Sequence, residues 1–268
     1  MVKGRIEASV IRKENITPHY IRVFLTSDEL DQFAETTIGD NNKIAIPPEG
    51  VNEIHFPDYD YETNQWIHPP VEVAPLIRTY THRGINLDKK ELIIDFVNHG
   101  ENGPASKWAI NAEKGAKLGI MMRTEPTKLF EKADWYLLVG DATSIPVLGA
   151  ILESLPSTAK GICIIEVHGR TDQQDLKTDA AIEFIWLYNP DAESGSEIAR
   201  RVREITLSKD SKFAYVAAEF STVKEVRQYL RKEMLWENNE LNAYSYWKSG
   251  VTEDQSQPDR QKEKHSTE

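Results

Sequence analysis

The chain has 268 residues, of which 40% are hydrophobic and 28% charged, and it carries a formal net charge of −11. This length is enough for two domains, and the composition is that of an ordinary globular protein. The acidic balance argues against a basic face for nucleic acids or anionic membranes, and no apolar run is long enough to span a bilayer, so we expect no nucleic-acid partner and no membrane insertion.

Cysteine usage indicates the compartment. The only cysteine, Cys163, cannot form an internal disulfide, and residues 1–7 lack the apolar core of a secretory signal. We therefore expect a cytoplasmic protein. Because Cys163 falls in the apolar run 162–167, we expect a buried structural thiol.

Runs rich in β-forming residues make up the first half of the chain. They cover residues 6–11, 20–25, 76–83 and 91–97. Short strands with turn signals between them predict a small antiparallel barrel. Residues 47–76 interrupt this pattern with six prolines and four aromatic residues, which predicts a long irregular insertion.

Strand and helix patterns alternate in the second half. The predicted strands are residues 135–139, 162–167, 182–187 and 213–217, and the predicted helices are 144–155, 197–206 and 222–234. Such alternation builds a doubly wound parallel sheet. We predict an antiparallel β-barrel domain at residues 1–128, an α/β domain with a doubly wound parallel sheet at 129–250, and a mobile polar tail at 251–268.

The run Arg-Thr-Tyr-Thr at residues 78–81 carries the most specific chemistry. Alternation along a strand places Arg78 and Tyr80 on one face. A guanidinium matches phosphate oxygens, and a tyrosine ring can cover a planar ring, so the pair suits a ligand with a pyrophosphate and a flat ring system. Thr81 adds a hydroxyl and a backbone N–H. Taken alone, the run also fits an edge strand with a solvated arginine.

Two further turns have the features of anion sites. Gly103-Pro104 is typical of a helix start, where free N–H groups attract a phosphate, although an ordinary helix with Trp108 in the core also fits. The turn from Gly140 to Thr143 follows a strand and opens a helix, where a nicotinamide phosphate would lie at a topological switch point. It lacks the Gly-x-Gly-x-x-Gly pattern, and Asp141 would repel a phosphate.

The order and spacing of several motifs resembles the siderophore-interacting protein family of ferric-siderophore reductases. The motifs are Arg-x-Tyr-Thr at 78–81, Asp-Phe-Val-Asn-His-Gly at 95–100, Gly-Pro-Ala-Ser-Lys-Trp-Ala at 103–109, Gly-Asp-Ala-Thr at 140–143, Ala-Ala-Glu at 217–219 and Ser-Tyr-Trp-Lys at 245–248. The resemblance spans residues 3–250. It implies an N-terminal FAD-binding barrel and a C-terminal domain that binds NADH or NADPH.

The resemblance also implies site residues. Its cofactor contacts would be Arg78, Thr79, Tyr80, Thr81, Arg83, His99, Gly103, Pro104, Ala105, Ser106, Asp141, Thr143, Glu219, Tyr246 and Trp247. Its basic substrate contacts would be Lys43 and Lys248, with Lys262 of the tail as an addition, although a solvated tail also explains Lys262. No acid–base pair and no metal-ligand set is expected, because the siderophore keeps the iron wrapped.

Two departures from the family pattern bear on cofactor binding. Ala218 stands where the family carries glycine, and its Cβ would crowd a cofactor that approaches the backbone closely. Ser245 also replaces a glycine, whereas the aromatic pair Tyr246 and Trp247 is kept. These two rings suit either ring covering or packing.

The preferred interpretation is an NAD(P)H-dependent, FAD-containing reductase of ferric siderophores, with hydroxamates favoured over anionic catecholates because the chain is acidic. Electron transfer to a protein carrier and non-catalytic flavin or siderophore binding remain alternatives. Arg170 would meet a 2′-phosphate, whereas Asp172 and Asp175 would oppose one, which slightly favours NADH.

Overall fold

The computed structural model describes residues 3–60, 62–209, 211–253 and 255–256. The chain divides into two compact units, Met1–Thr127 and Lys128–Glu268. Within the described residues, no helix is both long and apolar enough to cross a membrane.

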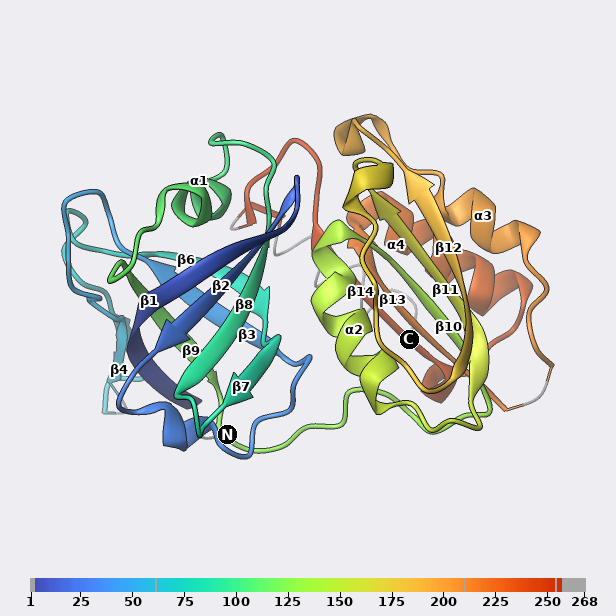
Figure 1. The fold of residues 1–268 in the computed structure, drawn as a ribbon, viewed down its shortest axis with the longest axis horizontal. Coiled ribbons are helices and arrows are strands. Elements are labelled where there is room, and N and C mark those ends of the chain that lie inside the picture. The colour runs from blue at the N-terminus through green and yellow to red at the C-terminus, as the bar shows by residue number, and fades with distance from the viewer. Residues whose placement is uncertain (1–2, 61, 210, 254, 257–268) are drawn as a thin grey trace. The chain divides into compact units, whose positions relative to one another are not determined.

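The first unit is built on an antiparallel sheet (Figure 1). Its strands are β1 (Lys3–Thr17), β2 (Tyr20–Thr26), β3 (Asn41–Ile46), β6 (Leu76–Thr81), β7 (Gly84–Asn86), β8 (Glu91–Val97) and β9 (Lys117–Arg123). Their order is β6-β3-β9-β1-β2-β8-β7, so β6 and β7 lie at the two edges of a half-barrel. The predicted antiparallel fold is confirmed.

Alternation along these strands fills the core of the first unit. Ile21, Val23 and Leu25 of β2 point inward with alternate residues of β1, β3, β8 and β9. Helix α1 (Pro104–Asn111) adds Ala105 and Ala109 to the same cluster. Burial of apolar surface therefore fixes α1 against the sheet.

Strand β9 was not predicted, and the structure gives the reason. Its middle residues are buried on both sides, so the polar and apolar alternation of a half-exposed strand is missing. A Cβ at Gly119 would lie 2.7 Å from Ile54 Cγ2 and from Phe56 Cε1. The insertion therefore packs directly on β9.

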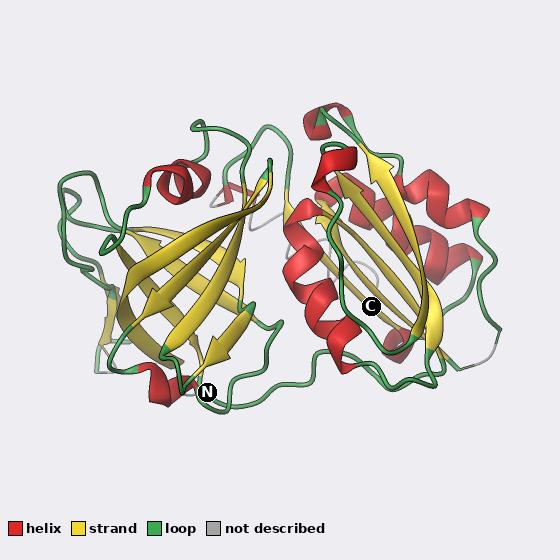
Figure 2. Cartoon of the chain, in the orientation of Figure 1, coloured by secondary structure: helices red, strands yellow, loops and turns green. Residues whose placement is uncertain are grey.

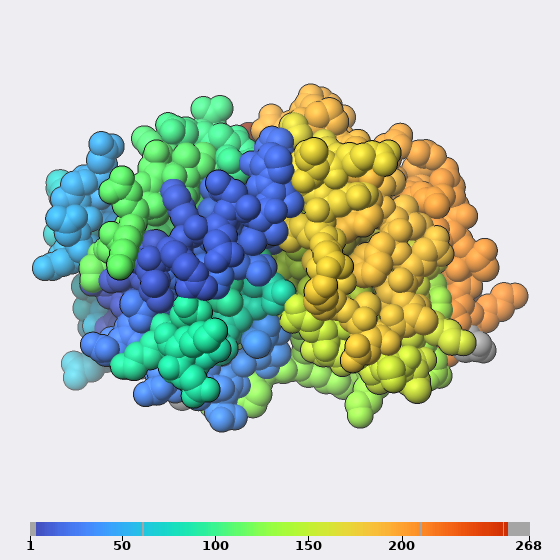
Figure 3. Space-filling model, in the orientation of Figure 1, coloured from blue at the N-terminus to red at the C-terminus, as the bar shows by residue number. Residues whose placement is uncertain are grey.

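The insertion at residues 47–76 contains a small hairpin that was not predicted. Strands β4 (Asp58–Asp60) and β5 (Gln65–Ile67) pair only with each other among the described strands. The rings of Tyr59 and Trp66 meet edge to face at 5.2 Å, and the exposed fractions of Trp66 and Ile67 are 57% and 58%. The insertion lies at the edge of the first unit (Figure 3).

The second unit contains a five-stranded parallel sheet, with order β12-β11-β10-β13-β14. The strands are β10 (Trp135–Asp141), β11 (Lys160–Val167), β12 (Ala181–Tyr188), β13 (Lys212–Glu219) and β14 (Leu241–Trp247). Helix α2 (Ile145–Ser154) covers one face, and α3 (Ile198–Glu204) with α4 (Phe220–Gln228) covers the other (Figure 2). The predicted doubly wound sheet is confirmed.

The strand order creates a switch point in this sheet. From β10 the chain moves to β11 on one side, and it later returns to β13 on the other side. The connections after β10 and β13 therefore diverge. In open parallel sheets, the carboxyl ends of the strands at such a switch point are the usual place of a ligand-binding crevice.

Shorter elements complete the chain. One-turn helices are η1 (Leu30–Phe33), η2 (Ala142–Ser144), η3 (Arg170–Asp172), η4 (Ala192–Ser194) and η6 (Asn238–Glu240), and a π-helical turn, η5 (Tyr229–Glu233), follows α4. The helix predicted at 222–234 is thus an α-helix that ends in a wider turn. Strand β14 was missed because its aromatic run was taken as a ligand motif. Cys163 is buried as predicted, and burial raises the pKa of its thiol.

Close packing between β10 and β11 requires a glycine at position 161. A Cβ there would lie 2.0 Å from the backbone oxygen of Tyr136. We expect Gly161→Ala to lower the free energy of unfolding by about 1–3 kcal/mol, the usual cost of overpacking. Gly84→Ala is the control, because its Cβ would meet Ile93 at an ordinary 3.5 Å. Equal urea stability of the two variants would contradict this account.

Candidate functional site

Arg78 and Tyr80 lie on one face of β6, and the pairing of β6 with β3 shows which one. Arg78 stands opposite Ile44, and Tyr80 stands opposite Asn42. Ile44 belongs to the buried core, so Arg78 and Tyr80 face the same side as the core, at the open edge of the sheet. Both side chains remain partly exposed, which leaves them accessible to a ligand.

An aromatic row joins β6 to α1. The ring of Tyr80 lies 4.7 Å from that of Phe96 on β8, and Phe96 lies 5.5 Å from Trp108 on α1. Trp108 therefore packs against the core, as expected if the segment after Gly103 is an ordinary helix. The row fixes Tyr80 from one side while its other side stays partly exposed.

The start of α1 lacks a side-chain cap. Gly103 occupies the N-cap and offers no side-chain acceptor, and Pro104 follows at the first helical position. The N–H groups of the first turn are thus available to an anion. The backbone N–H of His99 donates to Ser106 Oγ at 3.2 Å, and a Cβ at Gly103 would lie 2.2 Å from His99 Cε1. Glycine is therefore required where the His99 ring covers the helix start.

Three of the predicted cofactor residues are buried, and a fourth lies on the other face of β6. Ala105 and Ser106 have buried side chains, and Thr81 is buried on β6. Thr79 is exposed on the opposite face of β6, where Lys43 Nζ donates a hydrogen bond to Thr79 Oγ1. The predicted substrate residue Lys43 therefore shares a face with Thr79, not with Arg78 and Tyr80.

Arg83, another predicted cofactor residue, belongs to a buried ion cluster. Its Nε lies 3.8 Å from Asp95 Oδ2, while Arg22 donates two hydrogen bonds of 2.8 Å to the same carboxylate. The hydroxyl of Tyr20 also donates to Asp95, at 3.3 Å. Burial and the nearby carboxylate raise the pKa of Tyr20. This cluster holds the chain immediately after the Arg78–Tyr80 strand.

Asn42 is a residue that the sequence did not single out. Only 1% of it is exposed, and neither atom of its amide has a hydrogen-bond partner within the described residues. Buried amides are normally paired, since an unpaired one costs free energy. An unpaired amide opposite Tyr80 is consistent with a polar ligand or water beside this strand.

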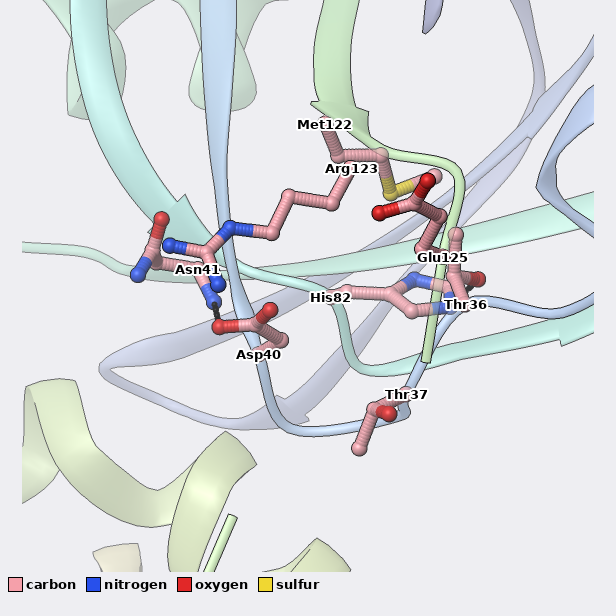
Figure 4. Close-up of a pocket in the computed structure, with 8 residues that line it drawn as sticks. All are labelled: Thr36, Thr37, Asp40, Asn41, His82, Met122, Arg123 and Glu125. Carbon is pink, nitrogen blue, oxygen red and sulfur yellow. Dashed lines mark hydrogen bonds between the residues drawn. The ribbon is translucent and has the colours of Figure 1, made fainter. Parts of the chain in front are cut away.

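A small polar pocket lies at the end of the same strand (Figure 4). Its volume is about 10 Å³, and its lining residues are Thr36, Thr37, Asp40, Asn41, His82, Met122, Arg123 and Glu125. His82 Nε2 lies 3.2 Å from Thr36 Oγ1, and burial lowers the pKa of His82 to about 4. The imidazole is therefore neutral at physiological pH.

The same loop fixes the last residue of the first unit. Thr37 Oγ1 donates to the Thr127 backbone oxygen at 3.0 Å, and Thr127 N donates to Thr37 Oγ1 at 2.8 Å. Thr127 Oγ1 donates to Asp40 Oδ2, also at 3.0 Å. Because His82 N donates to the Asp40 backbone oxygen, one loop connects the end of β6 with the end of the unit.

The buried His82 predicts an acid-dependent loss of stability. The unfolded chain binds a proton near pH 6.5, and the folded chain only near pH 4, so stability falls as the pH drops between these values. His82→Gln should remove about 2 kcal/mol of the loss between pH 7 and pH 4.5, as measured by urea unfolding. The difference between the two pH profiles isolates the contribution of His82. Identical pH profiles would contradict a neutral buried His82.

In the second unit, Asp141 connects three strand ends. Its Oδ1 accepts from Thr143 N at 2.9 Å, and its Oδ2 accepts from Glu219 N at 3.0 Å and from Trp247 Nε1 at 2.8 Å. Burial raises the pKa of Asp141, and these hydrogen bonds oppose the rise. The carboxylate that was expected to repel phosphate is thus turned into the protein, where it orders the crevice.

Glu219 has a similar role one strand away. Its Oε2 accepts from Ser221 N at 2.6 Å and from Thr222 N at 3.3 Å, which caps α4. Its Oε1 accepts from Ser249 N at 3.3 Å. Glu219 therefore joins the start of α4 to the segment after β14.

The aromatic pair of β14 lies beside these carboxylates. A register shift places Ser245 opposite Ala218 and Trp247 opposite Glu219, so Tyr246 lies in a β-bulge. Such bulges redirect side chains at the ends of sheets. Lys248 follows directly, and its Nζ lies 4.9 Å from the centre of the Phe220 ring.

Two small residues near these strand ends are closely packed within the protein. A Cβ at Gly140 would lie 1.8 Å from Ser144 Oγ and 2.5 Å from the Ala217 backbone oxygen. Glycine is therefore required at position 140, near the end of β10. Ala218 is buried in the apolar cluster formed with α3 and α4, so its methyl group contributes to the core rather than to the crevice.

The residues expected to distinguish NADH from NADPH lie in the segment that follows β11. Arg170 lies over the Tyr188 ring, 5.4 Å from its centre. Asp172 is buried, and Asp175 pairs with Lys177. Lys262 lies outside the described residues. In the described part of the chain, no three His, Cys, Asp or Glu side chains form a possible metal site.

Sequence reasoning missed residues that act through pairing. Tyr20, Arg22 and Phe220 were not singled out, and Asp95 entered only as the first residue of the motif at 95–100, although Arg22 and Asp95 are charged residues inside apolar strand runs. That pattern was an available signal, since a charge in an otherwise buried strand requires a partner.

Two family profiles match the chain. The profile of the siderophore-interacting FAD-binding domain matches residues 9–126, and the profile of the siderophore-interacting protein matches residues 133–250. The ferric vibriobactin reductase ViuB of Vibrio cholerae serotype O1 is 31% identical over 246 residues, which cover 91% of this chain and 89% of that protein.

Solved structures are similar over nearly the whole chain. SipS, a siderophore-interacting protein from Aeromonas hydrophila, has a TM-score of 0.80 at 26% identity and covers 96% of both chains. A siderophore utilization protein from T. fusca has a TM-score of 0.82 at 25% identity, covering 93% of this chain and 95% of its own. A ferredoxin NADP+ reductase from Neisseria gonorrhoeae with bound FAD and NADP has a TM-score of 0.58 at 12% identity, covering 90% of this chain and 98% of its own, and shows the fold alone.

Proposed function

Because the chain belongs to the siderophore-interacting protein family, we propose that it is an NAD(P)H-dependent flavoprotein that reduces ferric siderophores and so releases ferrous iron. The observation that carries this proposal is the edge strand β6, where Arg78 and Tyr80 share one accessible face in the same unit as the uncapped start of α1. The name of the ViuB relative supports the same reaction.

The first unit is an FAD-binding domain, and its residues fit this cofactor. Arg78 and the N–H groups at the start of α1 would bind the pyrophosphate. Tyr80, held by Phe96 and Trp108, would cover the flavin ring. The unpaired Asn42 amide and the glycine required at position 103 are consistent with a polar ligand close to the backbone.

Flavin chemistry matches the electron count of the reaction. A hydride from a nicotinamide carries two electrons, ferric iron accepts one, and bound FAD supplies the conversion between them, so one nicotinamide reduces two ferric ions. The protein binds and orients the reactants. None of these steps requires an acid–base pair from the chain.

The switch point of the second unit is the proposed nicotinamide site. Thr143, Glu219 and Trp247 lie at the carboxyl ends of β10, β13 and β14, where such ligands bind. Trp247 is held by Asp141. NADH is the favoured donor, because Asp172 and Asp175 oppose a 2′-phosphate near Arg170.

The proposed substrate is a ferric siderophore of hydroxamate type. A net charge of −11 repels trianionic ferric tris-catecholates on approach, whereas neutral ferric hydroxamates are not repelled. Lys43 and Lys248 are the proposed substrate contacts. Lys43 is the only cation in residues 35–72, which also contain eight carboxylates, so it is the single attractive point in that segment for an anionic ligand.

Removal of Arg78 tests the flavin site. Arg78→Ala should weaken FAD binding by about 1.5–3 kcal/mol, because a charged hydrogen bond to the pyrophosphate is lost. Titration of the apoprotein with FAD, followed by flavin fluorescence, measures this change. Arg5→Ala removes an exposed arginine of the same unit and should leave FAD affinity unchanged. Equal affinity of the Arg78→Ala protein and wild type would overturn the assignment.

The whole reaction is tested by anaerobic mixing. The FAD-loaded protein should bleach on addition of NADH and recover its colour when iron(III) tris(acetohydroxamate) is added, with a ferrous chelator reporting the product. At low salt the hydroxamate should be reduced at least as fast as a tris-catecholate, and salt should help the catecholate alone. A flavin that no nicotinamide bleaches would indicate a binding protein. A reduced flavin that only a protein carrier reoxidises would indicate a reductase that passes its electrons to that carrier.

A further inference from the structure

Three large apolar side chains of the insertion are exposed to solvent. Their exposed fractions are 57% for Trp66, 58% for Ile67 and 87% for Val71. Eight large apolar residues are exposed in the described part of the chain, and these three lie within six consecutive positions. Six residues span about 20 Å at most, so one partner surface can contact all three. Exposed apolar side chains that gather in one place mark interaction sites, whereas scattered ones do not.

The insertion is also acidic. Residues 47–76 contain six carboxylates and no lysine or arginine. Four of these carboxylates belong to the exposed residues Glu49, Glu53, Glu62 and Glu72. No positive side chain of the insertion offsets them. A partner that covers the apolar side chains therefore needs positive charge around its own apolar contact.

The base of the insertion is held on the outer face of the first sheet. Glu7 alternates along β1 with the core residues Ile6 and Ala8, so its side chain points outward. Glu7 Oε2 accepts a hydrogen bond from Ile54 N at 3.0 Å, and Glu7 Oε1 lies 2.8 Å from Lys117 Nζ. The hairpin that follows is thus attached to a fixed support.

The hairpin itself has a defined shape. Between its strands, Asp60 Oδ1 accepts from Glu62 N at 2.8 Å, and Asp60 Oδ2 accepts from Thr63 Oγ1 at 2.7 Å. The Trp66 ring meets the Tyr59 ring edge to face. An aromatic ring that is already held in place loses little freedom on binding, which suits it to anchor an interface.

We propose that the insertion is a docking site for a partner protein that has a basic surface with an apolar centre. Trp66, Ile67 and Val71 form the apolar contact, and the exposed carboxylates pair with lysines or arginines around it. An apolar centre within a polar rim is the usual arrangement of a protein interface. This surface is separate from the proposed flavin site, because Arg78 and Tyr80 face the core side of the sheet.

Charge distinguishes this partner from other occupants. A second copy of the chain would bring another acidic insertion and a net charge of −11, so the two copies would repel each other. Anionic membranes and nucleic acids are repelled for the same reason. A basic protein is attracted, and the attraction also accelerates its association.

Calorimetric titration of the full chain with synthetic peptides tests the site. A peptide of five Lys-Leu repeats is the basic and apolar probe, five Lys-Ser repeats keep only the charge, and five Glu-Leu repeats reverse it. The Lys-Leu peptide should bind about tenfold more tightly than the Lys-Ser peptide, and the Glu-Leu peptide should not bind. Equal affinity for the Lys-Leu and Lys-Ser peptides would mean a solvated acidic loop and would overturn the proposal.

The apolar contact is tested by substitution. Trp66→Ser should weaken binding of the Lys-Leu peptide by about tenfold, as expected for an aromatic anchor. Val71→Ser should weaken it by about two- to fivefold, and this variant keeps the test valid if Trp66→Ser does not fold, because Val71 is 87% exposed. Leu235→Ser is the matched control, since it removes an exposed leucine of the second unit.

The charged rim is tested in the same way. Glu62→Gln combined with Glu72→Gln should weaken binding of the Lys-Leu peptide by about two- to fivefold at low salt and make it less sensitive to added salt. Glu113→Gln removes an exposed carboxylate outside the insertion and should have no effect. A loss of the same size in the Glu113→Gln protein would show that only the overall charge matters and would contradict a local site.

Other occupants have their own signatures. Dimers in sedimentation velocity that Trp66→Ser abolishes would show that a second copy covers the site. Binding to phosphatidylcholine vesicles that Trp66→Ser abolishes would show a membrane contact. Either result overturns the proposal, as does unchanged peptide affinity in both Trp66→Ser and Val71→Ser. Bleaching of the flavin by NADH should be the same in Val71→Ser and wild type, so the proposed reductase function is judged separately.

Discussion

The buried carboxylate of Asp141 is the constraint on which the carboxyl end of the parallel sheet depends. Asp141 ends β10, and its side chain receives hydrogen bonds from Thr143 in the turn that follows and from Glu219 and Trp247 at the ends of β13 and β14. Burial disfavours the charged carboxylate and raises the pKa of Asp141. The hydrogen bonds that oppose this rise also fix the positions of Thr143, Glu219 and Trp247. Buried polar groups of this kind give a site one defined geometry when every hydrogen-bonding atom is satisfied. The hydrogen bonds to Asp141 therefore fix the relative positions of these three residues at the switch point.

In the first unit, buried polar contacts similarly hold the edge strand β6. The Arg78–Tyr80 strand is followed at once by His82 and Arg83, which face two different anchors. His82 is held by the loop that also binds Thr127, and Arg83 joins the carboxylate of Asp95. An edge strand pairs on one side only, and these anchors supply the fixation that a second neighbouring strand would give. Arg83 thus has a structural function in addition to the cofactor contact proposed for it.

Local patterns predicted much of this protein, and the failures have specific causes. Strand alternation alone placed Arg78 and Tyr80 on one face, because the side-chain period of a strand is two. Strand β9 was missed because the insertion covers its outer face, which removes the alternation. Ala218 was expected to crowd a cofactor, and the structure adds that it belongs to the buried cluster under α3 and α4. The sequence indicated neither this packing nor the hairpin within the insertion.

The sequence by itself determined the type and order of the elements, the antiparallel and parallel halves, and the residues able to bind phosphate or cover a ring. These follow from local periodicity, turn chemistry and side-chain type. The tertiary structure alone decided which of those residues meet. Asp141 and Trp247 are 106 residues apart, and Arg22 pairs with Asp95 across two strands that are not consecutive in the chain. Such contacts depend on strand order and register, which are set by the packing of the whole core and leave no signal in any single segment.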